Sequence, residues 1–262
     1  MVKENLNTFA AYLEREYMKI LVCISNVPDT TTKITFTDNN TKFNTAGVQF
    51  IINPYDELAL TRALELTEKQ GGTVTVINVG LTDAEPSIRK ALAIGATDAV
   101  RVNAEPTDAY FVAEQIASFA KSENFDLILT GRESIDYNGG MVCGLLAEML
   151  GVPSVNAINS LEIENDIATM MRDIDGGREK LSCKLPLVAS ALQELAEARI
   201  PNMRGIMSAR TKPLKVVDAT GAEKTSASVG FELPAPKGSC KMIAPENAEQ
   251  LIELLHNEAK VI

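Results

Sequence analysis

The sequence is short of the residues that most side-chain catalysis requires. It has one histidine, His256, and no tryptophan, which excludes catalytic triads, cysteine–histidine dyads and zinc sites built from several histidines. We expect His256, near the C-terminus, to be a solvated tail residue. No C-x-x-C pair is present, which argues against zinc ribbons, iron–sulfur clusters and thioredoxin-like chemistry. A reduced, cytoplasmic protein fits best, and its four separated cysteines are Cys23, Cys143, Cys183 and Cys240.

Basic residues and long apolar runs are also scarce. Lys and Arg total 25 against 35 Asp and Glu, a net charge of −10, so the chain lacks the basic surface that a nucleic acid backbone needs. No run approaches the roughly 20 apolar residues of a membrane span. Residues 1–17 contain glutamates and no apolar signal-peptide core, and we expect them to form a polar helical extension before a fold that begins at Met18. With 262 residues, 45% of them hydrophobic, the chain can bury a full core.

From Lys19 onward, short apolar runs alternate with helical periods. Strands separated by helices favour parallel pairing with right-handed crossovers. The predicted fold class is therefore α/β, a doubly wound, mostly parallel sheet, in which ligands bind beyond the carboxyl ends of the strands. The predicted strands are 19–24, 73–79, 99–102 and 125–130, and the predicted helices are 56–70, 86–94, 108–122 and 141–150.

The second half of the chain has a different pattern. Residues 161–183 alternate in the strand period around a turn at 175–177, which predicts an antiparallel hairpin, and a strand follows at 186–190. The basic stretch at 199–215 predicts a local positive patch on an acidic protein. A solvated edge with a few salt bridges is the alternative.

The last part of the chain is poor in core-forming residues. Gly, Ser, Thr and Pro dominate residues 217–245, which indicates an extended arm leading to a last helix at 245–257. Because an arm without a core of its own needs another surface to lie on, this pattern suggests a partner chain.

Loops at the predicted carboxyl edge carry the candidate ligand-binding residues. Loop 131–144 opens the next helix with Gly139 and Gly140, where bare backbone N–H groups attract phosphate. The alternative is a flexible turn, since the loop matches neither a Walker P-loop nor G-x-G-x-x-G. Segment 53–56 precedes the first helix, and helix capping alone would also explain it. Asp29, after the first strand, is typical of a turn.

Several segments, in order, resemble the electron transfer flavoprotein β subunit between Met18 and about Asp218. The most specific are the last two, because Asp-Gly-Gly-x-Glu followed by Pro and a strand is a signature of that family. The resemblance implies an adenine-nucleotide-hydrolase-like, Rossmann-like sheet. The segments are KILVCISNVPDT (19–30), NPYDE (53–57), IRKALAIGA (88–96), GRESID (131–136), RDIDGGRE (172–179) with PLVAS (186–190), and ARIPNMRGIMSAR (198–210).

The resemblance implies an αβ heterodimer that passes electrons through FAD. In that family the reactive FAD lies mainly on the α subunit, and the β subunit holds AMP or, in electron-bifurcating members, a second FAD. Thr30 would approach the flavin from the β side. Carried over by position, the nucleotide-binding residues are Cys23, Thr30, Asn53, Pro54, Tyr55, Asp56, Val79, Gly131, Arg132, Asp136, Tyr137, Asn138, Gly139, Gly140, Met141 and Val142.

The resemblance also implies a segment that docks partner proteins. Its residues would be Arg199, Met203, Arg204 and Met207. Met203 falls where the family places an apolar anchor, and a flexible thioether suits a surface that must fit several partners. An ordinary core methionine is the alternative.

One departure from the family lies in the phosphate loop. Residues 138–143 read NGGMVC, where members carry Thr and Gln side chains that can bind phosphate. Phosphate would then rest on backbone N–H groups, which leaves AMP or FAD open.

The sequence therefore predicts an electron-carrier β subunit that serves flavin dehydrogenases or a quinone- or ferredoxin-linked acceptor. The predicted domains are an extension (1–17), a nucleotide-binding domain (18–216) and an arm and helix that pack on the partner subunit (217–262). The first alternative is an electron-bifurcating, NADH-oxidising form. The second is a stand-alone adenine-nucleotide-binding regulator of the universal-stress-protein type, which would need neither the arm nor the docking segment.

Overall fold

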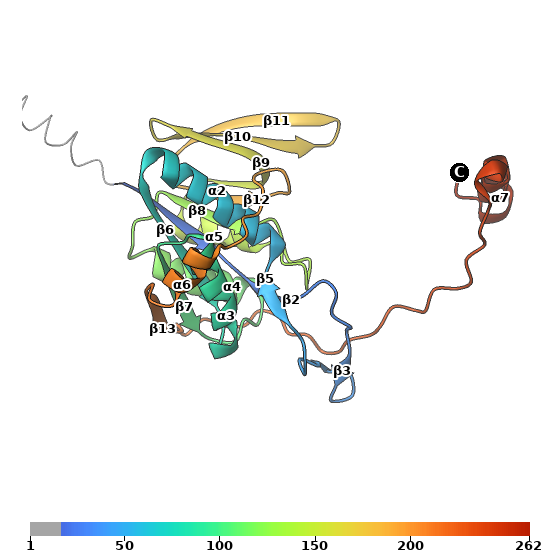
Figure 1. The fold of residues 1–262 in the computed structure, drawn as a ribbon, viewed down its shortest axis with the longest axis horizontal. Coiled ribbons are helices and arrows are strands. Elements are labelled where there is room, and N and C mark those ends of the chain that lie inside the picture. Colours follow the sequence, from blue (N-terminus) through green and yellow to red (C-terminus); the bar gives the residue numbers. More distant parts are fainter. Residues whose placement is uncertain (1–16) are drawn as a thin grey trace, which may run out of the picture.

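A nine-stranded sheet with helices on both faces dominates the structure, a computed structural model that describes residues 17–262 (Figure 1). From one edge to the other, the strand order is β11-β10-β9-β12-β8-β1-β6-β7-β13. This confirms the predicted doubly wound, mostly parallel α/β sheet. The parallel strands are β1 (Met18–Cys23), β6 (Gly72–Val79), β7 (Asp98–Asn103), β8 (Leu127–Gly131), β12 (Leu187–Ala191) and β13 (Leu214–Asp218).

The helices divide between the two faces of the sheet. Helices α2 and α3 supply residues to one buried cluster, and α4 and α5 supply residues to the other. Asp108 caps α4 as predicted, since its carboxylate accepts the N–H of Phe111 at 2.7 Å. The helices are α2 (Pro54–Gln70), α3 (Glu85–Ile94), α4 (Ala109–Ala120), α5 (Val142–Leu150), α6 (Met203–Ala209) and α7 (Ala248–Leu254), with short helical turns η1 (Thr82–Ala84), η2 (Pro245–Asn247) and η3 (Leu255–Ala259).

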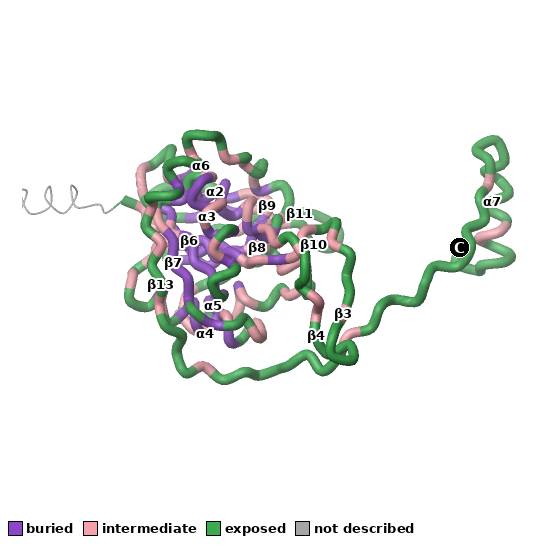
Figure 2. Tube along the Cα trace, turned by 60° about the horizontal axis from the view of Figure 1, so that its bottom comes forward, coloured by how far each residue is buried: buried purple, intermediate pink, exposed green. Residues whose placement is uncertain are grey.

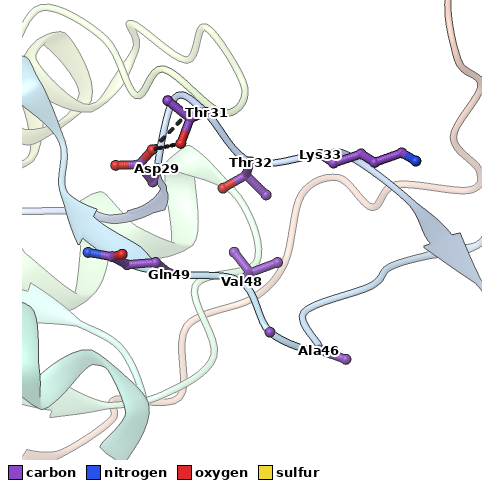
Figure 3. A pocket seen from close by; sticks show the side chains of 8 residues that line it. Asp29, Thr31, Thr32, Lys33, Ala46, Val48 and Gln49 are labelled. Carbon is purple, nitrogen blue, oxygen red and sulfur yellow. Dashed lines mark hydrogen bonds between the residues drawn. The ribbon is translucent and has the colours of Figure 1, made fainter.

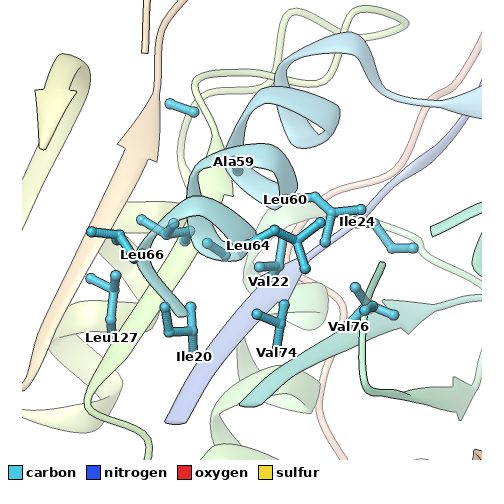
Figure 4. Packing of buried hydrophobic residues seen from close by; sticks show 14 of the residues in the cluster. Ile20, Val22, Ile24, Ala59, Leu60, Leu64, Leu66, Val74, Val76 and Leu127 are labelled. Atoms are coloured by element: carbon cyan, nitrogen blue, oxygen red, sulfur yellow. The ribbon is translucent and has the colours of Figure 1, made fainter. Parts of the chain in front are cut away.

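Strand β1 shows how the apolar runs build both layers. Ile20 and Val22 point to the α2 side of the sheet, where they pack with Leu60 and Leu64 (Figure 4). Leu21 lies in the cluster on the opposite face. A strand buried on both faces therefore needs apolar residues at every position, which is the pattern of this run.

The antiparallel part is larger than the single hairpin that the sequence predicts. It has three strands, β9 (Ser154–Glu164), β10 (Ile167–Ile174) and β11 (Gly177–Lys184). Strand β9 pairs with β12 in parallel and with β10 antiparallel, so it joins the two parts of the sheet. The predicted turn at 175–177 is present between β10 and β11.

Two small antiparallel pairs were not predicted. Strands β2 (Asn26–Pro28) and β5 (Phe50–Ile52) form one, and β3 (Phe36–Thr37) and β4 (Lys42–Phe43) form the other. Each has only two or three residues per strand, which is too short for the sequence to show an alternating period.

The C-terminal arm follows β13 and first runs along the body of the protein. Gln115 of α4 bonds to the backbone of Thr220, and the ring of Phe231 stacks on Phe36 with centroids 5.1 Å apart. The chain then leaves the body and carries α7 away from it (Figures 1 and 2). The extension predicted for residues 1–17 falls almost wholly outside the described residues. Among residues 17–262, none of the helices combines the length and apolarity needed to cross a membrane.

Candidate functional site

The winding direction of the sheet reverses at β1. The chain passes from β1 to β6 and β7 on one side and later returns to β8 and β12 on the other. In sheets wound in this way, ligands bind in the crevice outside the carboxyl ends of the strands at the reversal. The loops that follow Cys23 in β1 and Gly131 in β8 therefore border the candidate site.

Asp56, in the first turn of α2, joins these two loops. Its carboxylate accepts the backbone N–H of Ser25 at 2.7 Å and of Gly131 at 2.9 Å. The side chain is only 3% exposed, and burial raises the pKa of Asp56 to about 7, against the opposing effect of its hydrogen bonds. In the described part of the chain, no basic side chain pairs with this carboxylate, so its partners are backbone and amide donors.

Asn53 fixes the loop after β8 from the same direction. Its side-chain amide donates to the carboxylate of Asp56 (3.0 Å) and to the carbonyl of Glu133 (2.8 Å), and its carbonyl oxygen accepts the N–H of Ile135 at 3.3 Å. Asn53 stands at the N-cap and Pro54 is the first helical residue, as predicted, but no side chain caps the helix. Capping alone is therefore the wrong explanation for segment 53–56, since both polar side chains hold the neighbouring loops.

The loop from Gly131 to Gly140 is an ordered turn. Ser134 and Gly139 exchange backbone hydrogen bonds of 3.2 and 3.3 Å, and Asn138 adopts a left-handed backbone conformation (φ 49°) that asparagine tolerates. At Gly131 a Cβ atom would overlap the Asp56 carboxylate and lie 2.8 Å from Cβ of Tyr55. Glycine is thus required at Gly131 by the close approach of α2.

Helix α5 begins immediately after this loop with an open N-terminus. Met141 is its N-cap residue, and no side chain accepts the N–H groups of its first turn. The positive end of the helix dipole is therefore available to an anion. Tyr137 and Met141, with exposed fractions of 69% and 64%, provide apolar surface in the same segment.

Asn78, near the carboxyl end of β6, is a further polar residue at this edge that the sequence did not single out. It is 3% exposed, and its amide donates to the carbonyl of Ile24 at 2.8 Å. Its Oδ1 atom has no hydrogen-bond partner among the described residues. Buried polar atoms are nearly always paired in proteins, so this oxygen is an exception among the described residues. The sequence signal that could have identified Asn78 is its position, as an asparagine, in a mostly apolar strand.

Comparison with known proteins identifies the family. The family model of the electron transfer flavoprotein domain matches residues 40–222. The chain is 39% identical over 259 residues to the electron transfer flavoprotein subunit beta of Bacillus subtilis (strain 168), which covers 94% of this chain and 100% of that relative. The chain belongs to the electron transfer flavoprotein β-subunit family. The corresponding subunit from Syntrophomonas wolfei is 36% identical (93% and 98% covered), and the mitochondrial subunit from Arabidopsis thaliana is 30% identical (94% and 100% covered). Family membership confirms the resemblance seen in the sequence.

Several residues that the flavoprotein resemblance assigned to the nucleotide lie together in the structure. Asn53, Asp56 and Gly131 contact one another directly. Pro54 and Tyr55 occupy the same turn of α2. The remaining residues lead from the loop into α5: Arg132, Asp136, Tyr137, Asn138, Gly140 and Met141 are exposed, whereas Gly139 and Val142 are half-buried.

Cys23 and Val79 are placed differently from these loop residues. Both lie in the cluster beneath α4 and α5, and each is 6% exposed. Burial raises the pKa of the Cys23 thiol well above its ordinary value, and that of Cys143 to about 11. Both thiols are therefore protonated at neutral pH and are not nucleophiles.

Thr30 lies apart from the Asn53–Asp56 network, in the exposed loop after β2. The neighbouring Asp29 forms the predicted turn, because its carboxylate accepts the N–H and the hydroxyl of Thr31 at 2.9 and 2.5 Å (Figure 3). This loop and residues 46–49 border an open hollow of about 400 Å³.

The predicted docking residues lie around α6, a helix that the sequence did not predict. Met203 and Met207 are 73% and 68% exposed, so the core interpretation of Met203 is wrong. Arg204 is exposed as well, whereas Arg199 forms an ion pair with Glu68. Lys212 donates to backbone carbonyls, so the basic stretch is only partly available as a positive patch.

Proposed function

We propose that this chain is the β subunit of a heterodimeric electron transfer flavoprotein, that it binds AMP or FAD at the carboxyl edge of its sheet, and that it docks flavin dehydrogenases. The observation that carries the nucleotide site is the buried pair Asn53 and Asp56. Their hydrogen bonds fix the loops that follow β1 and β8, while the tip of loop 131–140 stays exposed. Buried polar side chains that preorganise an exposed loop are typical of a binding site.

The groups around the crevice fit an adenosine phosphate, which AMP and FAD share. The open N-terminus of α5 suits a phosphate, and Tyr137 and Met141 offer apolar surface to a ring. FAD, when bound, supplies the one- or two-electron chemistry, and this chain's residues bind and orient.

The arm supports a heterodimer. Residues 232–262 leave the body of the protein and expose Met242 and Ile252 (84% and 59% exposed). Apolar side chains on a helix without a core of its own are stabilised when a partner covers them. The relatives' name, subunit beta, makes an α subunit the expected partner.

Co-expression with the α subunit from the same organism tests the assembly and the ligand together. We expect a one-to-one yellow complex. Nucleotides released by denaturation then distinguish the forms, because one FAD plus one AMP per heterodimer indicates a simple carrier and two FAD indicate a bifurcating form. A colourless monomer that does not bind the α subunit would contradict the proposal.

The Gly139→Phe variant tests the loop itself. A Cβ at Gly139 meets only Cβ of Tyr137, at 4.0 Å, so a large side chain there would occupy the space beside the loop without straining the fold. We expect loss of the β-site nucleotide and an unchanged midpoint of thermal unfolding for the chain without nucleotide. Gly177→Phe, at an open turn far along the sheet, is the matched control. Full nucleotide content in Gly139→Phe would show that the loop is only a turn.

A further inference from the structure

Helix α6, which carries the exposed methionines, is firmly seated on α3. Arg89 of α3 donates to the carbonyl oxygens of Ala209 and Lys212, both at 2.8 Å. In return, Lys212 donates to the carbonyl oxygens of Leu92 and Ala96 at 2.9 and 2.6 Å. Arg89 thus satisfies carbonyls at and just beyond the end of α6, and Lys212, which follows α6, satisfies carbonyls at and just beyond the end of α3. Helix α6 is therefore fixed independently of what precedes it.

Gly205 allows this close packing. A Cβ there would overlap the carbonyl oxygen of Ala93 in α3, so the backbones of the two helices approach directly. The exposed face of α6, with Met203 and Met207, is therefore presented from a rigid support.

The segment before α6 has much less support. It passes over a cavity of about 540 Å³ that Ile94, Ser208 and Lys212 help to line. Ile200 is 92% exposed. Within residues 17–262, the hydrogen bonds from residues 196–201 to other parts of the chain all come from the Arg199 side chain.

Those hydrogen bonds form a two-pronged ion pair with Glu68 of α2. The two terminal nitrogens of Arg199 lie 2.7 and 2.9 Å from the two carboxylate oxygens of Glu68. The pairing raises the pKa of Arg199 and lowers that of Glu68. Most exposed ion pairs contribute little, but a bidentate arginine–carboxylate pair fixes orientation as well as distance.

We propose that Glu68 is a positioning residue for partner docking: it holds Arg199, and thereby orients Ile200, next to the exposed face of α6, toward a flavin dehydrogenase, while Arg199 itself does not contact that partner. The proposal rests on the docking function proposed above. It assigns Arg199 a role different from the direct contact expected from the sequence, because its guanidinium is already held within the chain by two hydrogen bonds to Glu68.

The test uses the purified heterodimer and a flavin dehydrogenase that reduces it. Glu68→Gln and Arg199→Glu each break the pair, and the double variant Glu68→Arg/Arg199→Glu restores it with the charges exchanged. Asp173→Asn, which breaks an exposed ion pair with Arg178 on β10 and β11, is the matched control. Reduction by dithionite, which needs no docking, reports on the flavin.

We expect the single variants to raise the KM for the dehydrogenase about two- to five-fold, with kcat and dithionite reduction unchanged. Hydrogen exchange at residues 198–203 should become faster in the same variants. The charge-exchanged double variant should return the KM and the rate of hydrogen exchange to wild-type values. The Asp173→Asn control should leave both at wild-type values.

Two outcomes would overturn the proposal. If the double variant keeps the high KM while Glu68→Gln behaves as wild type, Arg199 contacts the partner directly. If the single variants leave hydrogen exchange at 198–203 unchanged, the pair does not position the segment. The Met203→Ser variant distinguishes a failure of the positioning role of Glu68 from a failure of the proposed docking function. If Met203→Ser leaves the KM for the dehydrogenase unchanged, the dehydrogenase docks elsewhere and the docking function itself fails.

Discussion

Asp56 shows how one buried carboxylate can organise the loops of the candidate site. It accepts the backbone N–H groups of Ser25 and Gly131, which are 106 positions apart in the chain, and a third hydrogen bond from Asn53. A carboxylate without a cationic partner is costly to bury. These donors offset part of the cost. Because burial disfavours the charged form more than the donors favour it, the carboxyl group binds a proton more readily and the pKa of Asp56 is raised.

The raised pKa of Asp56 predicts how the free energy of unfolding depends on pH. In the unfolded chain Asp56 titrates near 3.8, and in the folded protein near 7. The folded state therefore binds more protons between these values, and the stabilisation is complete below 3.8 and lost as the pH rises to about 7. Relative to Asp56→Asn, the wild-type free energy of unfolding should fall across this window by on the order of a few kcal/mol.

Urea unfolding at pH values from about 5 to about 8 measures this difference. Asp218→Asn, which replaces an exposed carboxylate, is the control and should show no such slope. A wild-type stability that rises with pH relative to Asp56→Asn would mean that the hydrogen bonds to the carboxylate outweigh its burial.

At the scale of elements, Asp108 links helix α4 to the arm. One oxygen of its carboxylate caps α4 at Phe111. The other accepts the N–H groups of Thr225 and Ser226 at 2.6 and 2.9 Å, and the Thr225 hydroxyl at 3.3 Å. A residue that the sequence marks only as a helix cap therefore also fastens the first half of the arm.

The Asp108→Ser variant separates these two roles. Serine can still cap α4, but it has no second oxygen for the arm. We expect the thermal midpoint to change little, while amide exchange at residues 219–231 becomes faster. Asp108→Ala removes the cap as well and should lower stability by about 1 kcal/mol more. Unchanged exchange in Asp108→Ser would show that Gln115 and Phe36 hold the arm without Asp108.

At the scale of the molecule, the chain divides into a body that buries its own core and a segment that does not. The arm is fastened as far as Phe231, whose N–H also bonds to the carbonyl of Asn40 at 2.8 Å. Beyond it, residues 232–262 contain no buried residue, and Lys241 and Glu258 pair only with each other, at 4.0 Å. This segment has no support from the body.

Truncation after Phe231 tests that division. Since residues 232–262 add no buried apolar surface to the body, the truncated chain should unfold at the same temperature as the full chain. Its affinity for the α subunit should fall at least tenfold, measured by titration of the isolated subunits. A lower thermal midpoint would mean that the segment packs on its own body, and an unchanged affinity would place the α-subunit interface elsewhere.

The sequence by itself determined the fold class and which edge of the sheet carries the candidate site. Buried parallel strands and amphipathic helices are local patterns, and the order of strand and helix limits the connections to a few topologies. It also marked segment 53–56 and loop 131–140, because proline, glycine and asparagine at an element boundary are visible without a structure.

Only the tertiary structure decided what these residues contact. Asp56 has the same sequence signature whether it caps its own helix or binds Gly131, and Arg199 looks equally available to Glu68 or to a partner. The unpaired oxygen of Asn78 and the second role of Asp108 likewise depend on segments distant in the chain. Hydrogen bonds between such segments are fixed by packing, which no local pattern records.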